Sequence, residues 1–295
     1  MKKIIYLLVL TLIFSTTLAQ NYKICMSNPY KVGDKYRIYG TGTFSELNKV
    51  VIKGKTEEID SLVYEAKIDG VVTVLIVNEL KAQKKVKFQI TNCSTTNNDE
   101  KLMKEYLAKD TEIEVESIEG ETVYKIEGKS VSNEISTFLS NFISVSESFA
   151  ATDDDIHGTN NLVKVGDVWS INTKNYALDL LSDGVKIETE NIKGQTTFKK
   201  IEKIDNIKCI NLEIQCHLTD WTISEMPYGM KLKNSKIKGE MIGNYPLDYY
   251  IKPIQSKENY EAEIILVSDP KITDQDISII SKRTSNTEMN YRIVE

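Results

Sequence analysis

The chain has 295 residues and a formal net charge of −6, with 41% hydrophobic and 27% charged residues. This ordinary globular balance excludes a disordered tail or a fibrous repeat. An acidic surface repels phosphate backbones and anionic lipid headgroups, and the only adjacent lysine pairs beyond the N-terminus, Lys84-Lys85 and Lys199-Lys200, are isolated. We therefore expect no nucleic-acid partner.

The first residues have the pattern of a secretory signal peptide. Lys2 and Lys3 precede an apolar run from Ile4 to Phe14, and Thr17-Leu18-Ala19 places small residues at positions −3 and −1. The run is shorter than the ~20 residues that span a membrane, so we predict a signal peptide at residues 1–19, cleaved before Gln20, over an uncleaved anchor. We expect no integral membrane segment after cleavage and a periplasmic or extracellular location.

A short motif then occurs twice. Lys31–Ile38 and Lys164–Ile171 share five of eight residues, including Gly33-Asp34 and Gly166-Asp167, and Trp169 stands where the first copy has Tyr36. Gly accepts positive φ and Asp can bond its own backbone, so each Gly-Asp pair predicts a turn. We expect each turn to start the first long strand of one half, with the aromatic ring buried. An aromatic ligand contact is the functional alternative.

A second pair of similar segments supports this repeat. Ile68–Ile76 resembles Ile204–Leu212 at nearly the same spacing as the first pair. Two similar patches in the same order favour two related halves.

Most of the remaining sequence predicts antiparallel strands. Val86, Phe88 and Ile90 alternate with polar residues, as do Ile113 and Val115. The run Val71–Val77 is almost continuously apolar, which predicts a strand buried on both faces. The expected two-residue turns between strands are Asp69-Gly70, Glu119-Gly120 and Asp183-Gly184.

Two segments have helical spacing instead. One is 99–109, and the longer is 132–149, in which Ser132 is the expected N-cap and Ile135, Phe138, Leu139, Phe142 and Ile143 form one apolar stripe. We expect the longer helix to cover a sheet face. A partner-binding or membrane-surface helix is the alternative, although its polar side lacks lysine and arginine.

These patterns predict a mainly β fold with two tandem curved antiparallel sheets, each like a half-barrel, and one or two covering helices. The predicted parts are a first β domain at 20–149, with the helix near 132–149, a polar linker at 150–163, a second β domain at 164–270 and a C-terminal extension at 271–295. For the extension, a short helix and an appended strand both stay open.

The four cysteines are Cys25, Cys93, Cys209 and Cys216, and an exported chain permits disulfides. Cys209 and Cys216 lie seven residues apart on a predicted strand, which places them on opposite faces and beyond disulfide reach. Cys25 with Cys93 is the possible disulfide, and four free buried thiols are the alternative. Without a C-x-x-C motif, a cysteine metal site is not expected.

Few residues are equipped for chemistry. His217 is expected on the polar face of a strand, and His157 lies in the predicted linker. There, Asp153, Asp155 and Gly158 imitate the start of a calcium loop, but the twelfth position is Lys164, which opposes a cation. A solvated linker is the favoured interpretation, and we expect no metal and no cofactor.

Catalytic motifs are missing from the sequence. It contains no G-x-S-x-G, no H-E-x-x-H and no Gly-rich phosphate loop. Carboxylates such as Glu112, Glu114 and Glu116 lie on strand faces, where solvation is the usual explanation. No catalytic residue is assigned, and we lean away from an enzyme.

The signal peptide, the paired Lys-Val-Gly-Asp strands and a late Gly-rich strand at Ile237–Asp248 resemble exported bacterial β-proteins of unknown function. The pattern is also similar to that of periplasmic lipoprotein carriers, whose curved antiparallel sheet wraps a helix over an apolar cavity. This resemblance implies a fold and a compartment. The chain lacks a matching binding signature, so no site residue is implied.

Three functional hypotheses follow. The first is a non-enzymatic exported protein that binds an apolar ligand or a protein partner on a concave sheet face. The second is a structural or interaction module of an envelope or surface assembly, with an exposed apolar patch or an unpaired sheet edge. The third is a hydrolase with an unrecognised carboxylate pair, which requires two acidic groups facing one cleft, one of them desolvated.

Overall fold

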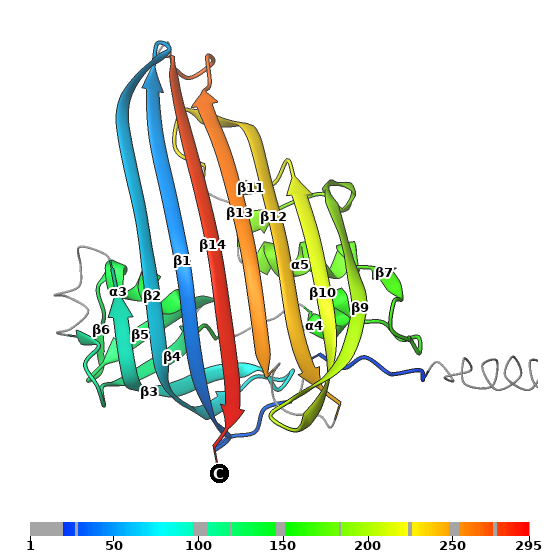
Figure 1. Cartoon of the computed structure of the whole chain (residues 1–295). Coiled ribbons are helices and arrows are strands. Elements are labelled where there is room, and N and C mark those ends of the chain that lie inside the picture. Colours follow the sequence, from blue (N-terminus) through cyan, green and yellow to red (C-terminus); the bar gives the residue numbers. More distant parts are fainter. Residues whose placement is uncertain are drawn as a thin grey trace, which may run out of the picture.

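A large, open antiparallel sheet dominates the computed structural model of the chain (Figure 1). The structure describes residues 20–26, 29–96, 106–118, 120–145, 151–182, 184–223, 226–247, 254–273 and 276–294. The predicted signal peptide and residues 99–105 of the predicted helix at 99–109 lie outside these ranges. Within them, the predicted mainly β fold, with curved antiparallel strands and covering helices, is confirmed.

Twelve strands form the large sheet, in the order β6-β5-β4-β3-β2-β1-β14-β13-β12-β10-β9-β7. Their bounds are β1 Lys35–Ile52, β2 Lys55–Val77, β3 Gln83–Thr95, β4 Glu112–Ile118, β5 Glu121–Ile126, β6 Lys129–Ser130, β7 Val168–Ser170, β9 Ile192–Ile204, β10 Ile207–Thr219, β12 Met230–Pro246, β13 Gln255–Ser268 and β14 Ile277–Ile293. A small two-stranded sheet pairs β8 (Val185–Lys186) with β11 (Thr222–Ile223).

The strands of the two predicted domains belong to this one sheet. β14, which lies in the predicted C-terminal extension, pairs along its whole length with β1 on one side and with β13 on the other. An unpaired edge as long as β1 would expose a row of backbone hydrogen-bonding groups, so the long strands gain from pairing with each other. The strands of the two predicted β domains are therefore joined edge to edge through β14. The predicted C-terminal extension, for which a short helix and an appended strand were both open, forms a central strand of the sheet.

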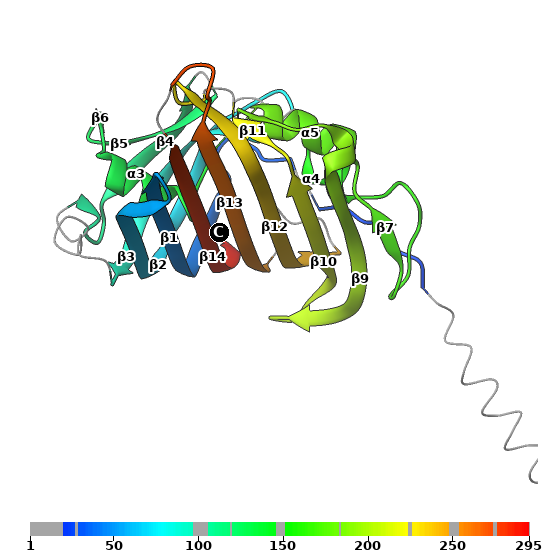
Figure 2. The ribbon, with the colours of Figure 1, turned by 90° about the horizontal axis from the view of Figure 1, so that it is seen from above.

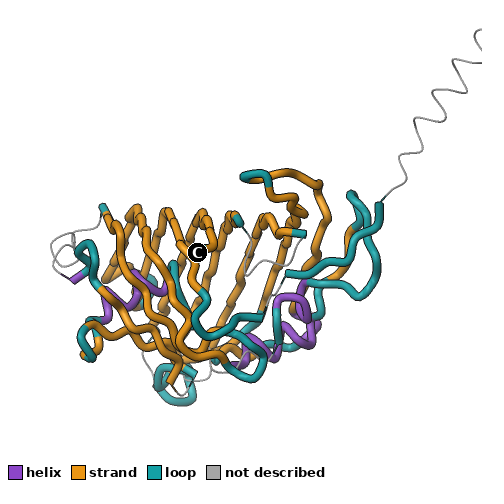
Figure 3. Tube along the Cα trace, turned by 90° about the horizontal axis from the view of Figure 1, so that it is seen from below, coloured by secondary structure: helices purple, strands orange, loops and turns teal. Residues whose placement is uncertain are grey.

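Three helices of the described chain lie on the same side of the sheet. They are α3 (Asn133–Ser140), α4 (Asp153–His157) and α5 (Thr173–Ser182), and a 3₁₀ turn, η1, spans Thr189–Asn191. The views from above and below show all three helices on the concave side of the sheet (Figure 2, Figure 3). The concave face is thus the covered one, and the convex face is open.

The helix predicted at 132–149 is shorter in the structure, where it corresponds to α3. Ser132 is its N-cap, as predicted, and its hydroxyl accepts a hydrogen bond from the backbone N–H of Ile135. The helix ends at Ser140, and Phe142 and Ile143 continue its buried stripe from the loop that follows. Residues 146–149 of the predicted helix lie outside the described part of the chain.

A short helix occupies part of the predicted linker. Thr152 caps α4 through a reciprocal capping box with Asp155, in which each side chain accepts from the other residue's backbone N–H. Ile156 is buried at 4% exposure. Ala151 and Val163 of the same segment are also buried, and Val163 packs in one apolar cluster with Phe198 of β9, so the predicted linker packs against the sheet.

The alternation of side chains explains the two faces. Along β1, Tyr36 and Ile38 are buried while Lys35 and Arg37 are exposed, and Phe88 and Ile90 show the same pattern in β3. The predicted burial of Val71–Val77 on both faces is wrong, because only one side of that run, the side of Val72 and Val74, is buried.

Two predicted turns are also corrected. Asp69-Gly70 is not a turn between strands, because it lies inside β2 at a register shift against β3. Gly70 does not have a positive φ, and a Cβ at this position would clash with the carbonyl oxygen of Gln89 and the ring of Phe88, so this glycine permits the close approach of β3. Gly184 follows α5 with a φ of 78° and so joins a helix to a strand. Gly120, with a φ of 87°, does lie between β4 and β5.

The repeated motif folds into the same turn twice. The N–H of Asp34 donates to the carbonyl of Lys31 at 3.1 Å, and the N–H of Asp167 donates to that of Lys164 at 3.0 Å. Each Asp side chain also accepts from the N–H of the same lysine, at 2.7 and 2.9 Å. Both glycines have a positive φ, of 93° and 94°, which favours glycine at these positions.

The chain continues differently after each turn. The first turn leads into β1, of 18 residues, and the second into β7, of only three. The segments Ile68–Ile76 and Ile204–Leu212 also differ, since the first lies within β2 and the second contains the turn between β9 and β10. The local motif is therefore repeated in structure, whereas the second pair of segments is not structurally equivalent.

The concave face holds three apolar clusters. The first is centred on β1 to β5 and α3, with Phe88 and Leu139 fully buried. The second lies on β9, β10 and β12 around Phe198 and Leu212, and the third packs α5 on β10 and β12 around Leu218 and Trp221. The first cluster is separate from the other two, and a cavity lies between them.

Candidate functional site: a cavity on the concave face

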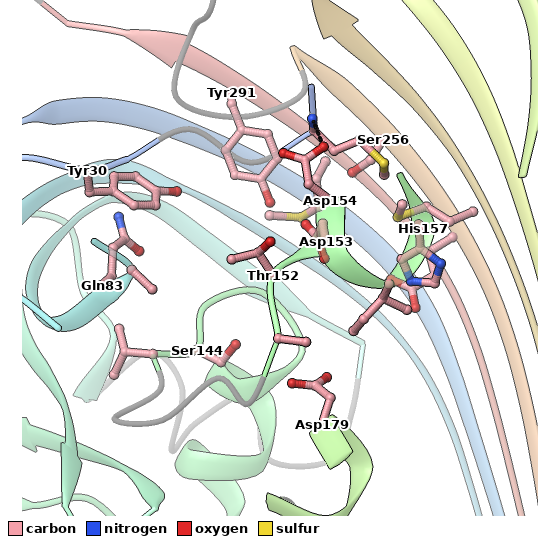
Figure 4. A pocket seen from close by; sticks show the side chains of 18 of the residues that line it. Tyr30, Gln83, Ser144, Thr152, Asp153, Asp154, His157, Asp179, Ser256 and Tyr291 are labelled. Atoms are coloured by element: carbon pink, nitrogen blue, oxygen red, sulfur yellow. Dashed lines mark hydrogen bonds between the residues drawn. The ribbon is translucent and has the colours of Figure 1, made fainter. Parts of the chain in front are cut away.

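The cavity has a volume of about 680 Å³ and lies between the sheet and the segments that cover it. Its floor comes from β12, β13 and β14, one wall from α4 and α5, and the other from the β2–β3 connection and the loop after α3. Figure 4 shows side chains from these elements pointing toward a common space. This volume is in the range of sites that hold small organic ligands.

The floor follows from strand alternation. Ser256 and Glu258 of β13 point to the concave face together with Met241 of β12 and with Thr287 and Met289 of β14. These residues are matched across the sheet, since Glu258 lies opposite Met241 on one side and Thr287 on the other. The floor is therefore a mixed surface of methionine, hydroxyl and carboxyl groups.

The α4 wall is fixed by hydrogen bonds to the N-terminal segment. Oδ1 of Asp154 accepts from the backbone N–H of Met26 at 2.7 Å, and Oδ2 accepts from Sγ of Cys25 at 3.8 Å. Asp154 thus has a structural role. Its neighbour Asp153 is exposed and lines the cavity.

The opposite wall contains a group of tyrosines. Tyr36 lies behind the wall, and its ring is 6.1 Å from that of Tyr30 and 6.2 Å from that of Tyr291, both of which line the cavity. The hydroxyl of Tyr36 and the side chain of Gln83 are hydrogen-bonded at about 3 Å. Burial raises the pKa of all three phenols, so they stay neutral.

The charged groups of the cavity are mostly acidic. Four carboxyl residues line it: Asp153, Asp154, Asp179 and Glu258. Among the described lining residues the only lysine or arginine is Lys81, whose side chain is exposed. Burial lowers the pKa of His157 to about 4, so this residue is neutral at pH 7.

Glu258 is a carboxyl group of the cavity floor with an unusual electrostatic environment. Loss of water around it and the negative charge of Asp153 raise its pKa. It forms no ion pair with any residue in the described part of the chain. A carboxyl group that is open to a cavity and lacks a counter-ion is a candidate for contact with a ligand.

The predicted repeat anchors lie outside the cavity. Tyr36 is buried at 4% exposure, as predicted, and supports the tyrosine wall from behind. Trp169 is only half-buried, and its Nε1 donates to the carbonyl of His157 at 2.8 Å. Gly33, Asp34, Gly166 and Asp167 form the two turns described above. The anchors therefore position the walls without touching the cavity.

All four cysteines are free thiols in the structure. Cys25 contacts Asp154, whereas Cys93 packs against the first apolar cluster, where burial raises its pKa to about 12. The possible Cys25–Cys93 disulfide is therefore not formed here. Cys209 and Cys216 lie on opposite faces of β10, with Cys209 buried and Cys216 half-buried.

The histidines differ from each other. His217 is exposed on the convex face, as predicted. His157 does not fit the solvated linker, because it packs against the ring of Tyr176 at 5.8 Å and its Nδ1 is buried without a hydrogen-bond partner among the described residues. The described residues contain no group of three or more histidine, cysteine or acidic side chains arranged to hold a metal ion.

Glu258 and Tyr291 are cavity residues that no sequence motif predicts. A signal for Glu258 was available, because it alternates with Tyr260, Ala262 and Ile264 on one face of the strand. An acid in phase with apolar residues is unusual on a buried face. No comparable signal marks Tyr291, which resembles any other inward-facing aromatic residue.

The described chain contains no helix with the length and apolar character that crossing a membrane requires. Exposed apolar side chains occur on the convex face of β2, at Ile59 and Val63, with exposures of 61% and 69%. Isolated exposed residues of this kind are common in soluble domains. We therefore place the candidate site in the cavity.

Comparison with known proteins gives distant similarities only. No protein-family model and no curated protein sequence matches the chain. Similar solved structures include a LolA superfamily protein from Nitrosomonas europaea, with 8% identity, coverage of 90% of this chain and 89% of that one, and a TM-score of 0.18. An outer membrane channel from Pseudomonas putida F1 has 7% identity, coverage of 90% and 97%, and a TM-score of 0.21.

The toluene transporter TodX of P. putida is similar to the same degree, with 6% identity, coverage of 92% and 96%, and a TM-score of 0.19. At scores this low, the similarities carry no argument about the ligand or the activity of this chain.

Proposed function

We propose that this chain is a non-enzymatic exported protein, periplasmic or extracellular, that binds a ligand with an apolar body in the cavity of its concave sheet face. The observation that supports this proposal is the cavity of about 680 Å³ between the sheet and its helices. Its apolar lining includes Met26, Leu80, Phe142, Met241 and Met289. Methionine side chains adapt to ligands of different shape, which suits a binding site of this kind.

A neutral fluorescent probe tests the proposal. N-phenyl-1-naphthylamine, titrated into the purified protein without its signal peptide, is expected to bind saturably at one site. The variant Ser256→Phe places a large side chain on the cavity floor and is expected to abolish the signal. Gln255→Phe is the matched control, because residue 255 is exposed on the opposite face of the same strand.

Circular dichroism of both variants establishes that the sheet is intact. Probe binding that is absent from the parent protein, or that Ser256→Phe and Gln255→Phe affect equally, would contradict a ligand site in the cavity. Native mass spectrometry of the protein purified from cells gives an independent readout, for which a bound small molecule is the expected result.

A second candidate function is hydrolysis. Asp153 and Glu258 line the same cavity, and the charge of Asp153 contributes to the raised pKa of Glu258. A carboxyl group whose pKa is raised beside a second carboxyl group is one feature of a general acid paired with a base or nucleophile. In this alternative, Glu258 would donate a proton to the leaving group.

An activity screen separates the two functions. Nitrophenyl glycosides and esters would be turned over by a hydrolase, and both Asp153→Asn and Glu258→Gln would abolish that turnover. A screen without turnover, from a protein that binds the neutral probe, favours the binding protein.

A further inference from the structure

The lining of the cavity contains acidic side chains that a purely apolar ligand does not require. A neutral lipid or hydrocarbon gains nothing from the carboxylates of Asp153 and Glu258, which are both exposed within the open cavity. The described lining carries four acidic side chains against one lysine, and His157 is uncharged at pH 7. Acidic groups therefore outnumber basic ones among the described lining residues, which favours positive ligands and disfavours anionic ones.

One carboxyl group has no partner of its own. Asp154 is occupied by the backbone N–H of Met26, whereas Glu258 has no ion pair or hydrogen bond within the described chain. Asp153 faces the cavity from α4 and lies near enough for its charge to act on Glu258. A cation placed between these two groups would relieve their repulsion and give Glu258 a counter-ion.

The aromatic wall provides an independent contact for a cation. Tyr30 and Tyr291 line the cavity on the side of β3 and β14, and Figure 4 shows both rings beside the space that Asp153 approaches from α4. Aromatic faces attract ammonium groups, most strongly where water is excluded. Carboxylates together with tyrosine rings form the chemistry that recognises quaternary and protonated amines.

The apolar part of such a ligand has its own contacts. On the floor, Met241 lies opposite Glu258 and Met289 lies opposite Ser256, and Phe142 and Val145 line the cavity from the loop after α3. A hydrocarbon chain on these side chains would leave its head group at the carboxylates.

We infer that the ligand is a cationic amphiphile, an alkyl or aryl chain with an ammonium head group, whose positive charge is held by Glu258 and Asp153 against the ring of Tyr291. This inference rests on the proposed function, since it specifies the ligand class of the same cavity.

Three probes of equal chain length test the head group. Decyltrimethylammonium, decanol and decanoate differ only in charge, and calorimetry of the whole mature chain measures their affinities. We expect the cation to bind about tenfold or more tightly than the alcohol, as for a charge-assisted contact. Decanoate is expected to bind more weakly than the alcohol.

Variants locate the head group. Glu258→Gln and Asp153→Asn are each expected to weaken binding of the cation about tenfold and to leave decanol unchanged. Glu261→Gln is the matched control, because it removes an exposed carboxylate from the convex face of the same strand. It is expected to change neither affinity.

The outcomes distinguish this inference from the proposed function. If decanol and the cation bind equally, or if Glu258→Gln leaves the affinity for the cation unchanged, the inference of a cationic head group is wrong. The proposal of an apolar-ligand site in the cavity is then retained. If none of the three probes binds, both proposals fail. A preference for decanoate would also overturn the inference.

Discussion

The two faces of β13 each carry a glutamate, and the surroundings of these two glutamates differ. On the convex face, the carboxylate of Glu263 lies between Nζ of Lys236 at 3.2 Å and Nζ of Lys282 at 2.5 Å, and these contacts lower its pKa. Five residues earlier, Glu258 faces the concave cavity without a counter-ion, and its pKa is raised. One strand thus carries a compensated and an uncompensated carboxyl group.

This difference shows where stability and function separate in the molecule. Opposite charges on neighbouring convex strands also pair at Arg37–Asp69 and Lys199–Glu213, as expected for a solvated face. The described lining of the concave cavity instead carries more acidic than basic groups, and Glu258 there forms no ion pair with a described residue. Local departures from a stabilising arrangement are typical of functional sites.

The largest expected effect compares an apolar residue of the concave face with a polar residue of the convex face on β10. Leu212 has no exposed surface, so Leu212→Ala removes buried methyl groups, leaves a cavity and is expected to cost about 2–5 kcal/mol of unfolding free energy. His217→Ala, on the exposed face, is expected to change it by less than about 0.5 kcal/mol. Urea denaturation of both variants measures the difference.

Equal losses in the two variants would mean that the two faces of β10 are buried alike. A loss below about 1 kcal/mol for Leu212→Ala would contradict the tight packing of the second apolar cluster.

Substitution of Glu263 and of Glu258 by glutamine is expected to change the unfolding free energy by intermediate amounts of opposite sign. Glu263→Gln weakens the contacts to both lysines and is expected to lower stability by about 1 kcal/mol at pH 7. Glu258→Gln removes an unfavourable charge and is expected to raise stability, by less than about 1 kcal/mol because the cavity is open to solvent. Thermal unfolding at pH 7 measures both.

The pH dependence gives the sign of each effect a second test. Because the folded pKa of Glu263 is lowered, its stabilisation is present above the unfolded value near 4.5 and is lost as pH falls through the folded value. Because the folded pKa of Glu258 is raised, its cost appears only as pH rises above 4.5. The gain from Glu258→Gln should therefore vanish at low pH, and a gain that persists there would contradict an ionisable cause.

The buried and exposed faces of the strands could be predicted from the sequence, because the alternation of apolar and polar residues is a local property. Tyr36 with Ile38, and Phe88 with Ile90, are buried as their period-two spacing predicts, and Ser132 is the N-cap that the helical stripe requires. The Val-Gly-Asp motif likewise predicts its own turn, because its hydrogen bonds join residues three apart.

The order of the strands and the composition of the cavity could not be read in this way. β1 and β14 pair although they lie near opposite ends of the chain, and no local pattern specifies a partner at that separation. Asp153 of α4 and Glu258 of β13 line one cavity only because the fold brings these elements to it, which the spacing of acidic residues in the sequence does not show. The same limit applies to Trp169, whose motif predicts the turn but not the short β7 that follows.

The smallest effect is expected for an exposed ion pair on the convex face. Nζ of Lys257 lies 3.0 Å from Oε1 of Glu288, with side-chain exposures of 48% and 56%. Water and salt screen such a pair, and ordering two long side chains offsets most of the attraction. Lys257→Ala is expected to lower stability by no more than about 0.5 kcal/mol, and a double-mutant cycle with Glu288→Ala should give a coupling of that size which falls in high salt. A coupling above about 1 kcal/mol would mean that ion pairs on the convex face contribute substantially to the stability of the sheet. The difference between the paired convex carboxylates and the unpaired Glu258 would then reflect stabilisation of the convex face as much as ligand binding on the concave face.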